Sequence, residues 1–113
     1  MSRIRSIKIE TLPSINAASP YVCTTYVIRE QTDSYLKIGI ATHPTRRLCS
    51  LQSGNPRKLR FVAVYEGTRT VCHEIEKLAH KYFGVEPKTE WFIGNPNDAI
   101  KYLNSFTDDE VAQ

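Results

Sequence analysis

Four side chains in this sequence could act together on a phosphodiester bond: Tyr26, Lys37, Arg47 and Glu76. Hydrolysis of such a bond needs a nucleophilic water, positive charge on the phosphate and help for the leaving oxygen. A phenol can orient or deprotonate water, and an arginine can clamp phosphate oxygens in bidentate fashion. One carboxylate suits magnesium or manganese, because these ions need few protein oxygens and keep several waters. The tyrosine, the lysine and the arginine are therefore groups suited to gripping and attacking a phosphodiester.

The first two of these residues lie in segments that predict a β-hairpin. Residues 21–29 and 35–41 are rich in β-branched and aromatic residues, and residues 31–34 between them are polar. Side chains alternate between the two faces of a strand, so Tyr26 and Lys37 are expected to be direct or diagonal cross-strand neighbours.

Arg47 falls in a predicted helix over residues 44–53, which ends at the Gly54-Asn55-Pro56 stop signal. Thr42 or His43 is expected to cap it. A buried stripe of Pro44, Leu48 and Leu51 would leave Arg47 at its border. Residues 59–65 predict a third strand, with Phe61 and Ala63 on one face and Val62 and Val64 on the other.

Glu76 belongs to a second predicted helix, from a cap at Thr70 to a stop at Gly84. Its expected buried residues are Val71, Ile75, Leu78, Ala79 and Tyr82, and its adjacent face carries Cys72, Glu76, His80 and Phe83. Residues 89–93 predict a last short strand, and Asn95-Pro96 opens a final helix to about residue 106. The sequence thus predicts a small α+β fold, with a mainly antiparallel sheet of three or more strands flanked by helices.

A chain of 113 residues has room for one such domain. We place it at residues 21–106, between an N-terminal arm or edge strand over residues 1–20 and an acidic tail over residues 107–113. No apolar run approaches the ~20 residues of a membrane span, and no apolar signal core is present. We therefore expect a cytoplasmic protein without membrane contact.

The three cysteines, Cys23, Cys49 and Cys72, are widely spaced and odd in number, so a disulfide framework or a zinc cluster is not expected. His73, Glu76 and His80 form an alternative zinc set on one helix face, although the HExxH spacing of zinc proteases is absent.

Positive charge is concentrated in the middle of the chain. No acid occurs from Ser34 to Tyr65, a window that contains Lys37, Arg46, Arg47, Arg57, Lys58 and Arg60. A stretch whose charged residues are all positive indicates an anionic partner. The alternative is a solvated basic face without a ligand. We expect Arg46, Arg57, Lys58 and Arg60 to bind nucleic acid through its phosphates.

Several short motifs occur in a characteristic order: Thr24-Thr25-Tyr26, Lys37-Ile38-Gly39, Arg46-Arg47-Leu48, Glu76 and Glu90-Trp91-Phe92. In this order the chain resembles the GIY-YIG nuclease superfamily over residues 21–103, and most closely a KIG-variant branch of phage and prophage proteins described as DNA-binding. The resemblance implies that Tyr26 orients or deprotonates water, that Arg47 stabilises the phosphate and that Glu76 holds Mg²⁺ or Mn²⁺. Trp91 and Phe92 are expected to close the core, with stacking on a base as the alternative.

Two positions depart from that pattern, since Lys37 stands where the family has tyrosine and Thr24 stands where it has glycine. Either Lys37 activates the phenol of Tyr26, or catalysis is weakened and binding remains. Our leading interpretation is a metal-dependent DNA endonuclease, a hydrolase. The alternatives are a DNA-binding module or regulator that does not cut, and a phage protein that acts on a host protein. RNA stays open as a substrate, and the sequence does not define an oligomeric state.

Overall fold

The computed structural model describes residues 4–10, 23–32 and 35–107. In chain order the elements are β1 (Arg5–Ile7), β2 (Cys23–Glu30), β3 (Tyr35–Ala41), α1 (Pro44–Gln52), β4 (Leu59–Gly67), α2 (Arg69–Phe83), β5 (Trp91–Ile93) and α3 (Pro96–Asn104). The predicted α+β fold is confirmed. The second half of the predicted N-terminal arm, the end of the hairpin turn and the acidic tail from residue 108 lie outside the described residues.

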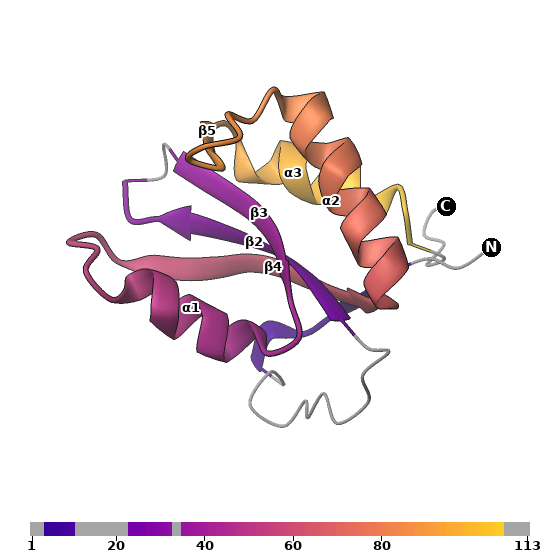
Figure 1. The fold of residues 1–113 in the computed structure, drawn as a ribbon, viewed down its shortest axis with the longest axis horizontal. Helices are drawn as coiled ribbons and strands as arrows, with labels where there is room; N and C mark the ends of the chain where they lie inside the picture. The colour runs from indigo at the N-terminus through magenta and orange to yellow at the C-terminus, as the bar shows by residue number, and fades with distance from the viewer. Residues whose placement is uncertain (1–3, 11–22, 33–34, 108–113) are drawn as a thin grey trace.

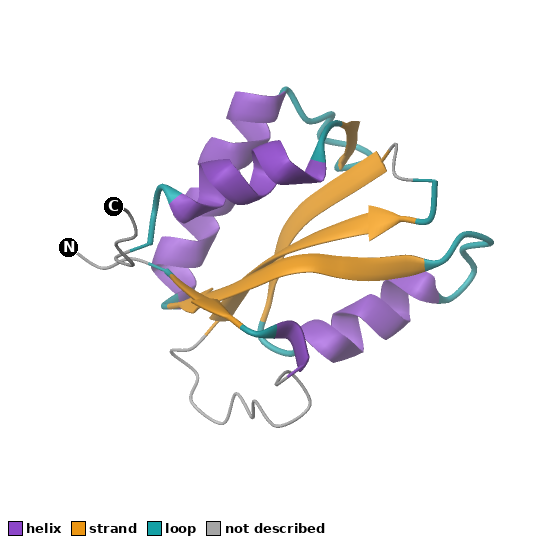
Figure 2. Ribbon diagram, turned by 180° about the vertical axis from the view of Figure 1, so that it is seen from behind, coloured by secondary structure: helices purple, strands orange, loops and turns teal. Residues whose placement is uncertain are grey.

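The strands form one antiparallel sheet in the order β1-β4-β2-β3-β5. Helix α1 covers one face of this sheet, and α2 and α3 cover the other (Figures 1 and 2). Each face has its own core. The larger core lies under α2 and α3 and includes Val27, Leu36 and Ile38, whereas the smaller lies under α1 and includes Tyr26 and Ile28.

The predicted hairpin is confirmed as β2 and β3. Tyr26 pairs with Gly39 and Ile28 pairs with Lys37, so Tyr26 and Lys37 are diagonal neighbours on the α1 face. The two turn-flanking strands therefore carry the candidate phenol and lysine on one surface, as the alternation of side chains predicts.

Strand β4 differs from its predicted alternation because it contains a β-bulge. Opposite β2, Val27 pairs with Ala63 and Ile28 pairs with Phe61, which leaves Val62 as the extra residue. Phe61 and Val64 consequently pack in the α1 core, and Val62 and Ala63 pack in the α2 core. The prediction that Phe61 and Ala63 share a face was wrong, since an inserted residue reverses the side of every residue beyond it.

Helix α2 begins two residues earlier than predicted, and its buried face differs in part from the predicted one. The hydroxyl of Thr68, rather than Thr70, accepts the capping hydrogen bond from the Val71 amide. Its buried residues are Cys72, Ile75 and Ala79, whereas Leu78 and Tyr82 are 45% and 67% exposed. Val71, Ile75 and Ala79 of the predicted stripe do pack in the core, but the buried face is turned toward Cys72, which leaves Leu78 and Tyr82 at the surface.

The remaining elements follow the predictions closely. Helix α1 has His43 at its N-cap position and Pro44 in its first turn. Helix α3 starts after Asn95, whose side chain accepts a hydrogen bond from the Asn97 amide. Residues 5–7 form the expected N-terminal edge strand, beside β4. Among the described residues, no helix is long and apolar enough to cross a membrane, and the cysteines there are free, Cys23 and Cys72 buried and Cys49 exposed.

Candidate active site

Tyr26 lies at the centre of the α1 face and is only 1% exposed. Its ring makes an edge-on contact with Phe61, with ring centroids 6.3 Å apart. The ring lies directly over Gly39, because a Cβ atom added to that glycine would be 2.7 Å from Cζ of Tyr26 and closer still to its hydroxyl. The glycine of the Lys-Ile-Gly triplet therefore makes the space in which the phenol lies.

Arg47, from the exposed side of α1, interacts with this phenol. Burial raises the pKa of Tyr26 above its usual value of 10.0, and hydrogen bonding and positive charge from Arg47 partly oppose that rise. The negative charges of Glu76 and Glu90 raise the pKa further. Because the net direction is upward, Tyr26 is a neutral phenol at physiological pH.

Glu76 interacts with the same phenol although its helix lies on the opposite face of the sheet. Strand β5 pairs only with Tyr35–Lys37 of β3, so within the described chain the edge from Ile38 to Ala41 has no neighbouring strand. Nε2 of His80, one turn after Glu76, contacts the Ile38 carbonyl at 2.7 Å. The carboxylate of Glu76 is 18% exposed and lies 3.9 Å from Nδ1 of His73. The part of the β3 edge without a strand neighbour thus lies against α2, one turn from Glu76.

Lys37 has a different partner from the expected one. Its ammonium, 5% exposed, lies 2.6 Å from Oε1 of Glu90. The hydrogen bond from Lys37 is the main cause that lowers the pKa of Glu90, and the charges of His80 and Arg47 also lower it. Arg47 is the cation that lowers the pKa of Tyr26, whereas Lys37 pairs with Glu90, so activation of the phenol by Lys37 stays a prediction.

Sequence reasoning missed Glu90 as a member of this site. Its backbone has a φ of 62°, a left-handed conformation that costs a residue with a side chain about 1 kcal/mol or more. The available signal was the Glu90-Trp91-Phe92 triplet, which we had read as structural. Phe92 is indeed buried in the α2 core, and Trp91 packs against the α1 core.

The donor groups suit a metal ion held by one protein ligand better than a metal ion held by several. Among the described residues, no group of three or more His, Cys, Asp and Glu side chains could hold an ion. His80 is occupied with a carbonyl, and this disfavours the zinc set of His73, Glu76 and His80. A single carboxylate such as Glu76 is compatible with Mg²⁺ or Mn²⁺, whose other ligands are water and phosphate oxygens.

The basic window separates into paired and exposed residues. Lys37 and Arg57 pair with acids from outside the window, Glu90 and Glu30. Arg46, Arg47, Lys58 and Arg60 are exposed. The predicted nucleic-acid-binding residues therefore do not form one uniform track, because Arg57 is tied to a buried carboxylate.

Comparison with known proteins assigns the chain to a family. The family model of the T5orf172 domain matches residues 20–107, so the chain belongs to the T5orf172 domain family. The searches of curated proteins and of solved structures found no match. The T5orf172 domain is a nuclease-like, DNA-binding domain, which is consistent with DNA as a partner of this chain.

This assignment corrects the resemblance to the GIY-YIG superfamily, since the matching family is a different one. The resemblance was carried by triplets in a hairpin followed by a basic helix, and two of its diagnostic positions, Thr24 and Lys37, already departed from the pattern. Apolar β-hairpins that end in a glycine are common, so such short triplets do not distinguish one family from another.

Proposed function

We propose that this chain is a metal-dependent endonuclease that hydrolyses phosphodiester bonds in DNA. The observation that carries the proposal is that Arg47 and Glu76, from helices on opposite faces of the sheet, both influence the pKa of the buried Tyr26 phenol. A cation, a carboxylate and a hydroxyl are the groups that hydrolysis of a phosphodiester needs.

Each residue has a distinct task in this proposal. Arg47 is exposed and binds a non-bridging phosphate oxygen, where it stabilises the negative charge that builds up. Tyr26, as a neutral phenol, accepts a hydrogen bond from the attacking water and so orients it. Glu76 would hold Mg²⁺ or Mn²⁺, which supplies Lewis-acid stabilisation of the leaving oxygen. The Lys37–Glu90 pair fixes the strand next to them.

A second candidate function is DNA binding without cleavage. The observation that favours it is the state of Tyr26, which is 1% exposed and has a raised pKa. A buried, protonated phenol is a poor general base. The exposed cations Arg46, Lys58 and Arg60 would still bind the DNA backbone in a salt-sensitive and sequence-independent way.

Nicking of supercoiled plasmid with Mg²⁺ or Mn²⁺ at low salt tests the proposal, with a gel shift in EDTA to measure binding. We expect Arg47→Ala and Glu76→Ala to lose nicking by about a hundredfold, as is typical when a transition-state contact is removed. Glu74→Ala is the matched control for Glu76, since Glu74 is an exposed acid on the same helix. Arg46→Ala should weaken binding but leave nicking at saturating protein unchanged.

The outcomes separate the two candidates. Nicking that requires metal and is lost in both variants supports the endonuclease. A gel shift without nicking in either metal supports the non-cleaving module. A wild-type protein that neither shifts nor nicks DNA refutes both.

A further inference from the structure

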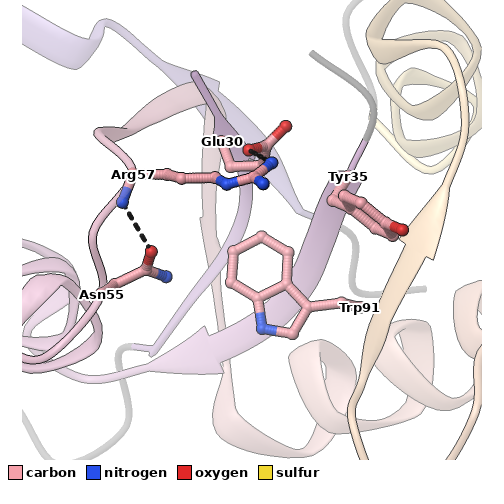
Figure 3. Close-up of a pocket in the computed structure, with 5 residues that line it drawn as sticks. All are labelled: Glu30, Tyr35, Asn55, Arg57 and Trp91. Carbon is pink, nitrogen blue, oxygen red and sulfur yellow. Dashed lines mark hydrogen bonds and ion pairs between the residues drawn. The ribbon is translucent and has the colours of Figure 1, made fainter. Parts of the chain in front are cut away.

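A pocket of about 310 Å³ lies at one end of the sheet, and its lining differs from the rest of the basic window. Five residues line it: Glu30, Tyr35, Asn55, Arg57 and Trp91. They come from the ends of β2 and β3, from the loop between α1 and β4, and from β5 (Figure 3). The volume is at the lower end of small-ligand sites, which suits one planar heterocycle.

The pocket combines aromatic walls with hydrogen-bond donors. Figure 3 shows the indole of Trp91 between Asn55 and Tyr35, with the guanidinium of Arg57 across from it. Among the described residues that line the pocket, the one carboxylate is Glu30, which Arg57 engages at 3.2 Å. A guanidinium carries five N–H groups, and both contacts of Arg57 to Glu30 and Thr32 use Nη1. The polar character of the pocket is therefore that of a donor site.

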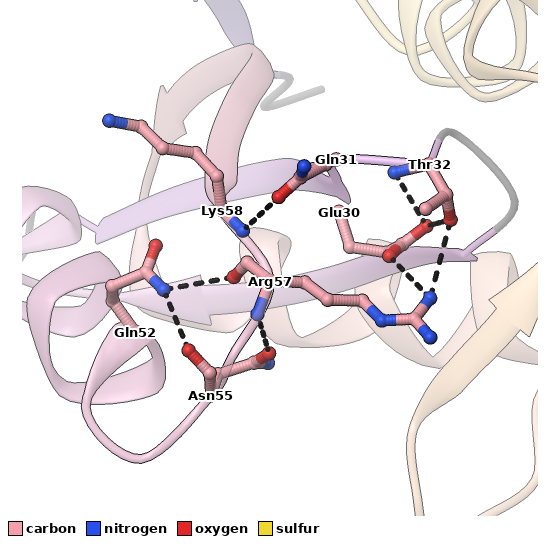
Figure 4. Close-up of polar contacts among 7 residues, drawn as sticks. All are labelled: Glu30, Gln31, Thr32, Gln52, Asn55, Arg57 and Lys58. Carbon is pink, nitrogen blue, oxygen red and sulfur yellow. Dashed lines mark hydrogen bonds and ion pairs between the residues drawn. The ribbon is translucent and has the colours of Figure 1, made fainter.

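The walls of the pocket are held in place before any ligand binds. Gln52 donates to the carbonyl of Arg57 at 2.9 Å and accepts from the amide of Leu59 at 2.8 Å. The side chain of Asn55 accepts from the Arg57 amide at 2.9 Å, and Gln31 of the hairpin accepts from the Lys58 amide at 3.0 Å. These bonds join the α1–β4 loop to the β-hairpin (Figure 4), so little ordering is needed on binding.

Trp91 links the pocket to the face of the sheet that carries the proposed active site. This residue pairs with Lys37 across β3 and β5, and it packs against the same core as Tyr26. The next residue back, Glu90, is the partner of Lys37. The pocket therefore lies on the α1 face of the sheet, as Tyr26 does.

From these observations we infer that the pocket binds an unpaired nucleobase of the DNA strand whose phosphate lies at Arg47. The base would stack on Trp91 and Tyr35 and turn its acceptor atoms to Arg57 and Asn55. A base inside a duplex cannot reach such a pocket without leaving its stack, so single-stranded or locally opened DNA is the substrate class. Donors in the pocket favour bases rich in carbonyl acceptors, such as thymine. This inference rests on the proposed function for the position of the phosphate.

Trp91 is the only tryptophan of the chain, so its fluorescence reports on the pocket directly. The experiment titrates the full-length protein, in EDTA to prevent cleavage, with an oligothymidylate of about 12 nucleotides, within the usual site size of single-strand binders. The matched ligand is an abasic strand of equal length and charge. We expect the thymidylate strand to quench Trp91 and to bind about tenfold more tightly than the abasic strand, since stacking of one base contributes about this much.

Two variants assign the effect to the pocket. Tyr35 is 42% exposed, so Tyr35→Ala should fold, bind the thymidylate strand several-fold more weakly and bind the abasic strand as before. Tyr82→Ala removes a tyrosine that is 67% exposed and stacks on Tyr102, away from the pocket. It should leave both affinities unchanged.

The possible failures are distinguishable. Equal affinity for both strands without quenching overturns the pocket and leaves the proposed DNA binding intact. Binding of neither strand overturns both. Quenching by free thymidine monophosphate at the concentration at which the strand acts would mean that the pocket takes free nucleotides, which overturns its assignment to a strand.

Discussion

Replacement of Gly39 by alanine should displace the phenol at the centre of the candidate site. The added Cβ would lie 2.7 Å from Cζ of Tyr26, about 1 Å inside the optimal separation of two carbon atoms. Tyr26 is 1% exposed and packs edge-on against Phe61, so its ring has no open space into which it can retreat.

The expected magnitude follows from two opposing effects. Insertion of a methyl group into a packed core costs about 1–3 kcal/mol, and the severity of this overlap places Gly39→Ala near the upper end. Loss of glycine entropy in the unfolded chain returns roughly 0.4–1 kcal/mol. The free energy of unfolding should therefore fall by about 2 kcal/mol, which corresponds to a Tm lower by roughly 8 °C for a domain of this size.

Urea unfolding monitored by circular dichroism measures this change, and plasmid nicking measures its effect on the site. Gly94→Ala is the matched control, because its Cβ would meet the ring of Phe92 at a milder 3.1 Å and should change stability by less than about 1 kcal/mol. A Gly39→Ala protein that is as stable as Gly94→Ala and nicks plasmid at the wild-type rate would refute the argument that Tyr26 occupies the space over Gly39.

Three other substitutions test the ion pair of Glu90 and the buried phenols of Tyr65 and Tyr26. Glu90→Gln leaves the buried ammonium of Lys37 with a neutral partner and should cost about 1–2 kcal/mol at pH 7 in urea unfolding, a value reduced because Glu90 is partly exposed. Since the pKa of Glu90 is lowered from 4.5 in the folded protein, this difference should begin to fall below pH 4.5 and be lost as the pH passes through the lowered pKa, and an undiminished difference at pH 3 would contradict the ion pair. Burial raises the pKa of Tyr65 from 10.0 to about 12, so the protonated phenol stabilises the fold below pH 10. The wild type should lose about 3 kcal/mol as the pH rises from 10 to beyond 12, and Tyr65→Phe should lose less, since Tyr26 still contributes. Tyr26, whose pKa is also raised, should orient water as a neutral phenol, so the nicking rates of wild type and Tyr26→Phe should show parallel pH profiles from pH 7 to pH 8.5. A tenfold rise per pH unit in the wild type alone would identify a phenolate base instead.

The hairpin and the order of helices could be predicted because their signals are local. Alternating residues and a polar turn define β2 and β3, and Pro44 and Gly54 bracket α1. The diagonal placement of Tyr26 and Lys37 follows from side-chain alternation alone. No knowledge of distant contacts was needed for these elements.

Features that depend on distant contacts were not predictable in the same way. Both faces of β4 are apolar, so the alternation pattern could not locate Val62 as the bulged residue. Two overlapping apolar stripes run along α2, and only packing against the sheet selects the one with Cys72 and Ala79. The ion pair between Lys37 and Glu90 joins residues that meet only because β5 returns to the edge of β3.

The short length of β5 limits which insertions this domain could accept. An insertion that lengthened β5 beside residues 38–41 would offer new backbone partners to β3 and would compete with His80 for the carbonyl of Ile38. The sheet would gain hydrogen bonds, but the passage between its faces would close and Glu76 would be separated from Tyr26. A more complete sheet would therefore be incompatible with a site assembled from both of its sides.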